Sequence, residues 1–284
     1  MNNTERTWTT VIKPHSKLWE IDFNEIWRYK DLWAMYIKRD ITTMYKQTIL
    51  GPLWFLIQPA ITTIMYMVVF GGIAGIPTDG IPQPLFYLAG ICIWQYFADC
   101  LNKTSATFLS NAGVFGKVYF PRIIAPMASV TSNLVKFGVQ LFLFLIVYIY
   151  FVIQGTNVHP NITILLFPVL VFMLAGFGLG FGMIVSSLTT KYRDLTILFS
   201  FIVQLWMYGT PVIYPLSTIT NEKLLLAMKL NPITAIVETF KYSTLGAGTF
   251  SWYMLGYSFL FMVVIFFIGL VMFNREQRSF MDTV

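Results

Sequence analysis

Few residues in this chain could perform chemistry, and the familiar catalytic patterns are missing. The stretch Gly113-Val-Phe-Gly-Lys-Val118 has the look of a phosphate-binding loop. Its glycine spacing differs from Gly-x-x-x-x-Gly-Lys-Ser/Thr, however, and Val118 has no hydroxyl to bind magnesium. His15 and His159 lie outside the apolar segments, which therefore contain no histidine for a zinc site or for acid–base catalysis. We expect a protein that is not an enzyme and holds no cofactor or metal of its own.

Asp99 and Lys136 are the clear ionisable residues within long apolar segments. Such residues are costly to insert into a membrane and are candidates for an ion or proton relay. Each lies near a predicted end of its segment, where a long side chain can reach water. We therefore expect both to lie at an interface rather than in a relay.

Aromatic residues make up 17% of the chain. Most are expected to pack or to lie at the two membrane interfaces. Some could line a conduit, because flat aromatic faces can carry sugar rings without fixed charge. The candidates for such a conduit are Tyr66, Phe70, Trp94, Trp206 and Tyr208.

The elements that must position these residues are membrane helices. Hydrophobic residues form 56% of the 284 residues and charged residues only 11%, against about 25% charged in a soluble domain. Apolar runs of roughly 20 residues, the length of a membrane-crossing helix, recur along the chain. We predict an all-α polytopic membrane protein with six spans, not a β-barrel, whose strands would be short and alternating. The predicted spans cover residues 53–76, 85–101, 123–152, 162–188, 195–213 and 252–273.

The basic residues predict the orientation of these spans. The positive-inside rule places fifteen of the 19 Lys and Arg residues in the cytoplasm when both termini are cytoplasmic. Lys223, Lys229 and Lys241 then lie outside, and Lys136 lies within a span. Topology thus accounts for the net charge of +6, and we expect no nucleic-acid partner.

Residues 1–50 form a cytoplasmic leader that precedes a transmembrane domain covering residues 51–284. Within the leader, apolar residues recur at helical spacing opposite Asn24, Arg28, Asp31 and Lys38. This pattern predicts an amphipathic helix in the headgroup plane. The alternative is a helix docked on protein. The apolar face consists of Phe23, Ile26, Trp27, Trp33, Ala34, Ile37 and Ile41.

The inner loop from Asn102 to Arg122 is too apolar for a solvated linker. It carries Phe108, Leu109, Val114 and Phe115 among small polar residues. A short helix offered to a cytoplasmic partner would have this composition. A helix end resting on the membrane surface is the alternative.

The outer segment from Tyr214 to Ser251 is likewise too apolar for a free loop. Short helices are predicted over residues 217–229 and 232–245, dipping back into the outer leaflet. Irregular backbone at that depth is tolerated where it packs in protein or lines a cavity. We expect a re-entrant outer gate that includes Tyr214 and Glu238. In the alternative, Glu238 only pairs with Lys241 or Tyr242 on its own helix.

Two further features are expected to serve packing. Gly176-Phe-Gly-Leu-Gly-Phe-Gly182 contains overlapping Gly-x-x-x-Gly patterns, which let helices approach closely. Contact within the subunit is favoured over a dimer seam or a gate. Cys92 and Cys100 lie roughly 12 Å apart at 1.5 Å per residue on one helix, too far for a disulfide.

Several short motifs follow one another along the chain, and together they cover it from about Leu32 to Arg278. The motifs are Leu50-Gly-Pro-Leu-Trp54 with Gln58-Pro59, Tyr119-Phe-Pro-Arg122, Lys191-Tyr-Arg-Asp194, Pro211-Val-Ile-Tyr-Pro215, and Asn231-Pro232 with Glu238. In this order, they resemble the ABC-2 family of transporter permeases, in particular those that export O-antigen, capsule or teichoic acid.

The resemblance implies a homodimer in the bacterial inner membrane, bound to two ABC ATPase subunits that hold ATP and magnesium. The inner loop would then include the coupling helix, and the first and fifth spans of two copies would line the conduit. The substrate would be a lipid-linked polysaccharide exported from the cytoplasm. The alternatives are an ABC-2 exporter of a smaller lipid or drug, a secondary transporter, and a membrane scaffold.

Overall fold

The computed structural model describes residues 23–46, 48–156, 158–192 and 194–283, and these residues form helices and connecting loops without a strand. Outside this description lie the first 22 residues of the leader, with Trp8 and Trp19, and Arg193 of the motif Lys191-Tyr-Arg-Asp194. The helices are α1 (Phe23–Arg28), α2 (Lys30–Tyr45), η1 (Gly51–Leu53), α3 (Trp54–Tyr66), η2 (Met67–Ile73), α4 (Gln83–Ser105), α5 (Thr107–Phe115), α6 (Ile124–Ile153), η3 (Ile162–Leu166), α7 (Phe167–Thr189), α8 (Leu195–Tyr208), η4 (Leu216–Thr218), α9 (Glu222–Leu230), α10 (Pro232–Leu245) and α11 (Trp252–Thr283).

Five helical segments in the described chain are long and apolar enough to cross a membrane. They are Gly51–Ile73, Gln83–Ser105, Ile124–Ile153, Ile162–Thr189 and Trp252–Gln277. The predicted spans at 53–76, 85–101, 123–152, 162–188 and 252–273 correspond to these five, with ends that differ by up to four residues.

The predicted fifth span, residues 195–213, is helical only in part and does not count among these five. Its helix α8 ends at Tyr208 and has only 14 residues, about 21 Å at 1.5 Å per residue, against a hydrocarbon core of about 30 Å. The sequence explains the early end, because Pro211 has no N–H for the helix and disfavours helical backbone at Thr210. The chain continues from Gly209 to Tyr214 as turns without helix.

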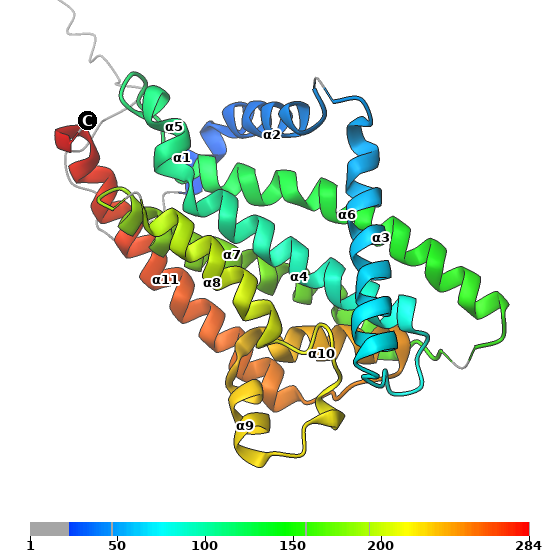
Figure 1. The fold of residues 1–284 in the computed structure, drawn as a ribbon. Coiled ribbons are helices and arrows are strands. Elements are labelled where there is room, and N and C mark those ends of the chain that lie inside the picture. The colour runs from blue at the N-terminus through cyan, green and yellow to red at the C-terminus, as the bar shows by residue number, and fades with distance from the viewer. Residues whose placement is uncertain (1–22, 47, 157, 193, 284) are drawn as a thin grey trace, which may run out of the picture.

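Helices α4 and α7 form the centre of the bundle, with α6 on one side and α11 on the other (Figure 1). Four glycines make the close packing of α7 possible. A Cβ at Gly178 or Gly182 would meet Cys100 or Thr104 of α4 at 2.4 Å, and a Cβ on Gly180 would meet the α11 backbone at 2.9 Å. The Gly-x-x-x-Gly pattern therefore packs within the subunit, as expected.

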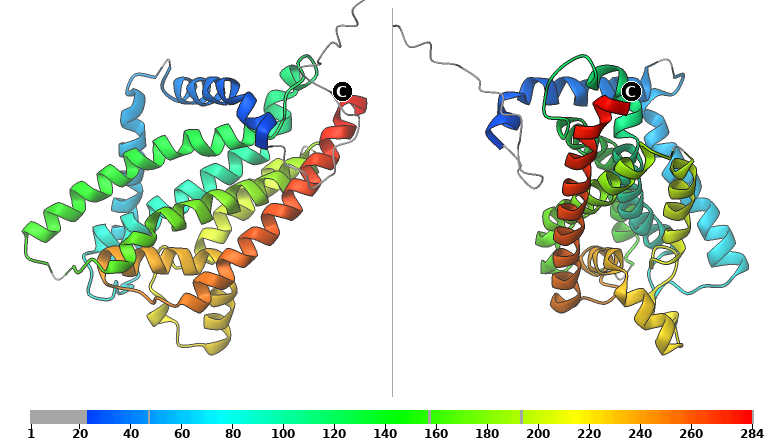
Figure 2. Two further views of the ribbon diagram at one scale, coloured as in Figure 1. Left: turned by 180° about the vertical axis from the view of Figure 1, so that it is seen from behind. Right: turned by 90° about the vertical axis from the view of Figure 1, so that its left-hand side faces the viewer.

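The two ends of the bundle carry different elements. Helices α1, α2 and α5 and the carboxyl end of α11 gather at one end, whereas α9 and α10 lie at the other (Figures 1 and 2). Helix α2 lies across the bundle end and packs on α6. Its Tyr36 is buried in a cluster with Phe108, Phe120 and Phe273, so this part of the leader helix docks on the protein, while Phe23 and Trp27 stay exposed.

Helix α10 has the bounds that the sequence predicts. Asn231 caps its first turn by accepting from the N–H of Ile233 at 3.1 Å, and Pro232 occupies the first helical position. Gly246, with φ of 76°, ends it in the left-handed conformation. The other predicted outer helix, residues 217–229, is divided into η4 and the shorter α9.

Candidate functional site

The candidate site is built around the break that follows α8, from Gly209 to Tyr214, where the backbone is not helical. Thr210, Val212 and Ile213 in this break are at most 1% exposed. Buried irregular backbone needs hydrogen-bond partners, because the carbonyls that a helix would satisfy are otherwise unpaired.

Two side chains of the α10 region supply those partners. The Asn231 side-chain amide donates to the carbonyl of Gly209 at 2.7 Å and to the hydroxyl of Thr210 at 2.9 Å. The Lys241 ammonium donates to the carbonyl of Pro211 at 2.6 Å and to that of Val212 at 3.3 Å. Helix α10 therefore holds the break at both of its ends.

The other wall of the break is α4. A Cβ on Gly90 would lie 2.6 Å from the carbonyl oxygen of Val212 and 3.1 Å from its Cα. Only glycine permits this approach without a shift of the backbone. Phe86, one turn earlier on α4, lies with its ring 3.6 Å from the Lys241 ammonium, a cation–π distance.

Glu238 and Lys241 are both buried on α10, at 3% and 1% exposed. Burial is the largest influence on each group: it raises the pKa of Glu238 and lowers the pKa of Lys241. Glu238 Oε2 accepts from the backbone N–H of Thr249 at 2.9 Å and from its hydroxyl at 3.3 Å. Glu238 Oε1 is buried and has no hydrogen-bond partner within the described chain.

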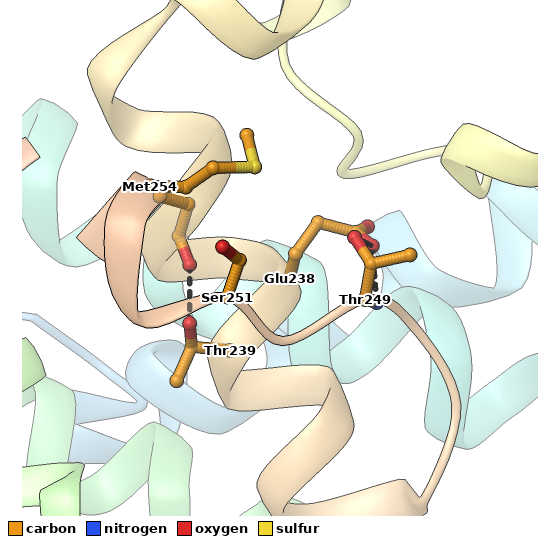
Figure 3. Close-up of a pocket in the computed structure, with 6 residues that line it drawn as sticks. Glu238, Thr239, Thr249, Ser251 and Met254 are labelled. Carbon is orange, nitrogen blue, oxygen red and sulfur yellow. Dashed lines mark hydrogen bonds between the residues drawn. The ribbon is translucent and has the colours of Figure 1, made fainter. Parts of the chain in front are cut away.

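Figure 3 shows Glu238 reaching towards Thr249 on the loop between α10 and α11. The small pocket there is also lined by Thr239, Ser251 and Met254. Glu238 thus lies inside the protein rather than at an open mouth. Among the described residues, Glu238 is bonded to Thr249 and forms no ion pair with Lys241.

Tyr214, the other predicted gate residue, closes the break. Its hydroxyl donates to the carbonyl of Tyr208 at 2.7 Å. It also lines an open, mainly apolar groove of about 500 Å³ between the end of η2 and the segment that contains η4 and α9. Nearby, the Ser217 hydroxyl donates to Asp79 at 2.7 Å, which ties η4 to the loop before α4.

The five conduit candidates form two aromatic pairs and one exposed residue. Trp94 is 4% exposed and packs edge-on against Trp206 at 6.4 Å, so these two stabilise the contact of α4 with α8. Tyr66 and Phe70 are half-buried neighbours on α3 and η2, 5.4 Å apart. Tyr208 is 47% exposed on α8.

The coupling candidates form the helix expected of them, α5, but do not share one face. Phe108 is buried and stacks on Phe273 of α11 with ring centroids 4.6 Å apart, and Phe115 is also buried. Leu109 is half-buried and Val114 is exposed. Direct contact with a partner is therefore possible for Leu109 and Val114, whereas the two phenylalanines anchor α5.

Asp99 and Lys136, the two ionisable residues expected within apolar segments, form an ion pair. The Lys136 ammonium lies 2.7 Å from the Asp99 carboxylate, which also accepts from Gln95 at 3.0 Å. Both cysteines are free and buried. A further ion pair joins Lys191 of the α7–α8 turn to Glu276 of α11, at 3.5 Å.

The sequence did not predict the roles of Gly90 and Lys241 at the break. Lys241 was recognised only as an outer basic residue and a possible partner of Glu238. The available signal was a lone cation in an apolar helix, which requires a partner when it is buried. Nothing in the sequence around Gly90 marks the approach of Val212, which is 122 residues away by their numbers.

Comparison with known proteins gives the family. A family model described as ABC-2 type transporter matches residues 31–245, well over half of the chain. An O-antigen export system permease protein RfbA of Myxococcus xanthus is 27% identical over 219 residues, covering 76% of this chain and 81% of that protein. The RfbA permease of Klebsiella pneumoniae is 24% identical, with 89% and 94% covered. The polysialic acid transport protein KpsM of Escherichia coli is 24% identical, with 86% and 93% covered. This chain belongs to the ABC-2 type transporter family.

Proposed function

We propose that this protein is the transmembrane subunit of an ATP-driven exporter that moves a lipid-linked polysaccharide from the cytoplasm to the outer side of the bacterial inner membrane. The observation that carries the proposal is its similarity, over nearly their whole length, to permeases named for O-antigen export and polysialic acid transport. The ABC-2 family match supports the same mode of transport.

A separate ATPase would supply the energy, bound as two subunits to a homodimer of this chain. The absence of a phosphate-binding loop from the sequence motivates this part of the proposal. The edge of α5 that carries Leu109 and Val114 is the candidate docking surface. Because Phe108 and Phe115 pack α5 against α11 and its neighbours, a movement of this edge by the ATPase would be transmitted to the helices of the bundle.

The conduit would be formed where two copies face each other through α3 and α8. These helices lie at the periphery of the bundle (Figure 1). Both are largely exposed, for example at Ile64 and Val68 of α3 and at Phe201 and Leu205 of α8. Tyr66 and Tyr208 lie on the same two helices and would offer aromatic faces to sugar rings.

In this proposal α8 and the break after it together make a sixth crossing, and both termini are cytoplasmic. The end of the bundle with α2, α5 and the carboxyl end of α11 faces the cytoplasm. The break, α9 and α10 would form the outer gate, which is closed in this state because the break and most of α10 are buried.

The test is reconstitution of the chain with its ATPase partner in vesicles that contain lipid-linked polysaccharide. We expect ATP-dependent movement of the glycan across the membrane, and no movement when the phosphate-loop lysine of the ATPase is replaced. Movement driven by an ion gradient without ATP would instead identify a secondary transporter. ATP-dependent export of a small lipid or drug, but of no glycan, would identify the smaller-substrate exporter.

A further inference from the structure

Lys241 is an unusual cation because its partners are backbone carbonyls. Its ammonium lies 2.6 Å from the carbonyl oxygen of Pro211 and 3.3 Å from that of Val212. The ring of Phe86 covers it at 3.6 Å. A buried ammonium is costly unless it is well bonded, so these contacts favour one position of the break over others.

A second partner is available to this ammonium on its own helix. Glu238 precedes Lys241 by three residues, the spacing at which helical side chains are neighbours. Its Oε1 is buried and has no hydrogen-bond partner within the described part of the chain. The carboxylate is held on its other oxygen by Thr249. Lys241 could therefore leave the break and remain bonded without reaching water.

We propose that Lys241 is the latch of the outer gate: its ammonium binds the carbonyls of Pro211 and Val212 when the gate is closed and moves to Glu238 Oε1 when the gate opens. The exchange exposes the break and pairs the two buried charges. Asp79 is the other acidic group that interacts electrostatically with Lys241. It is held by Ser217 at 2.7 Å and fastens η4 separately.

The latch rests on the proposed export function, but its closed state can be tested without transport. Val212 is fully buried in the closed state. A Val212→Cys reporter, in a background with Cys92→Ala and Cys100→Ala, is labelled from outside with a membrane-impermeant maleimide. We expect slow labelling at rest in this background. Lys241→Met should raise the rate roughly tenfold or more, the effect expected from losing a hydrogen bond to a charged group.

Two matched variants separate the latch from loss of charge or fold. Lys241→Arg keeps donors at this position and should restore slow labelling. Lys229→Met removes an exposed lysine of α9 and should leave the rate unchanged. A reporter at Ile93, buried in α4, should stay unlabelled in all variants; labelling there would show unfolding. Slow labelling in Lys241→Met with Ile93 protected would overturn the closed-state role.

The open-state partner is tested by Glu238→Gln in the complex with its ATPase. We expect slow labelling of the Val212→Cys reporter at rest, as in the background, but little of the acceleration that ATP produces there. Normal acceleration in Glu238→Gln would overturn the exchange. If the background complex shows ATP-dependent acceleration but exports no polysaccharide, the proposed substrate is wrong and the latch stands.

Discussion

At the residue scale, the break after α8 depends on a close approach of two backbones and on side chains that bond backbone carbonyls. The break after α8 is defined by Gly90 on one side and by Asn231 and Lys241 on the other. Each acts through a contact that tolerates little change. Together they allow the chain to continue after α8 as a buried turn in which the carbonyls of Gly209, Pro211 and Val212 are hydrogen-bonded.

Gly90→Ala tests this close approach. The added Cβ would lie 2.6 Å from the Val212 oxygen, so the break must shift or α4 must move. Overpacking of this kind costs typically about 1–3 kcal/mol, and we expect a lower midpoint of thermal unfolding in detergent. Gly138→Ala in α6 is the control, because its Cβ would meet nothing within 4 Å. Equal midpoints for the two variants would contradict the packing of α4 against the break.

The sequence predicted short helices in the outer segment, and the structure has them as α9 and α10. The sequence did not predict which side chains bond the carbonyls of the break. Which groups satisfy the break depends on contacts between residues far apart in the chain, such as Lys241 with Pro211. Periodicity describes one element at a time and does not contain such contacts.

At the scale of elements, helix bounds followed the local signals where these were strong. Asn231, Pro232 and Gly246 fixed both ends of α10. The helix expected through residues 195–213 ends at Tyr208, although the apolar composition continues beyond that residue. Hydropathy measures transfer into the membrane, but Pro211 decides whether the helix can continue.

Helix α5 separates anchoring from docking within one element. Val114→Glu changes a residue that is 40% exposed. We expect it to weaken binding of the ATPase subunit while thermal stability stays close to the original, since a surface change usually costs no more than about 0.5 kcal/mol. Co-purification with the ATPase measures the first effect and thermal unfolding the second. Retained ATPase binding with normal coupled export would exclude this edge as the docking surface.

Phe108→Ala is the complementary change on α5. Its ring is fully buried and stacks on Phe273. Removing a buried phenylalanine ring costs about 3–5 kcal/mol, so the midpoint of unfolding should fall clearly even without the ATPase. If stability is unchanged and only ATPase binding is lost, Phe108 acts as a contact residue rather than as an anchor.

At the scale of the whole molecule, we propose that this permease depends on separate ATPase subunits for energy. We expect the purified chain alone to hydrolyse no ATP above a detergent blank, because no phosphate-binding loop is encoded. Release of phosphate in the presence of magnesium is the measurement. Steady turnover by the chain free of any ATPase subunit would contradict the proposed division of labour.

The orientation of the whole bundle gives the last prediction. The turn after α7 lies at the same end as the carboxyl end of α11, because Lys191 contacts Glu276. Helix α9 lies at the opposite end (Figure 2). If α8 and the break complete a sixth crossing, Tyr192→Cys and Leu226→Cys, at positions that are 63% and 60% exposed, should be labelled from opposite sides of the membrane. The distribution of basic residues assigns Tyr192 to the cytoplasm and Leu226 to the outside.

Both variants carry Cys92→Ala and Cys100→Ala, and an impermeant maleimide is added to intact spheroplasts or to inverted vesicles. Labelling of both positions from one side would mean that the chain returns after α8 without crossing, and the conduit would then need to be formed by other helices.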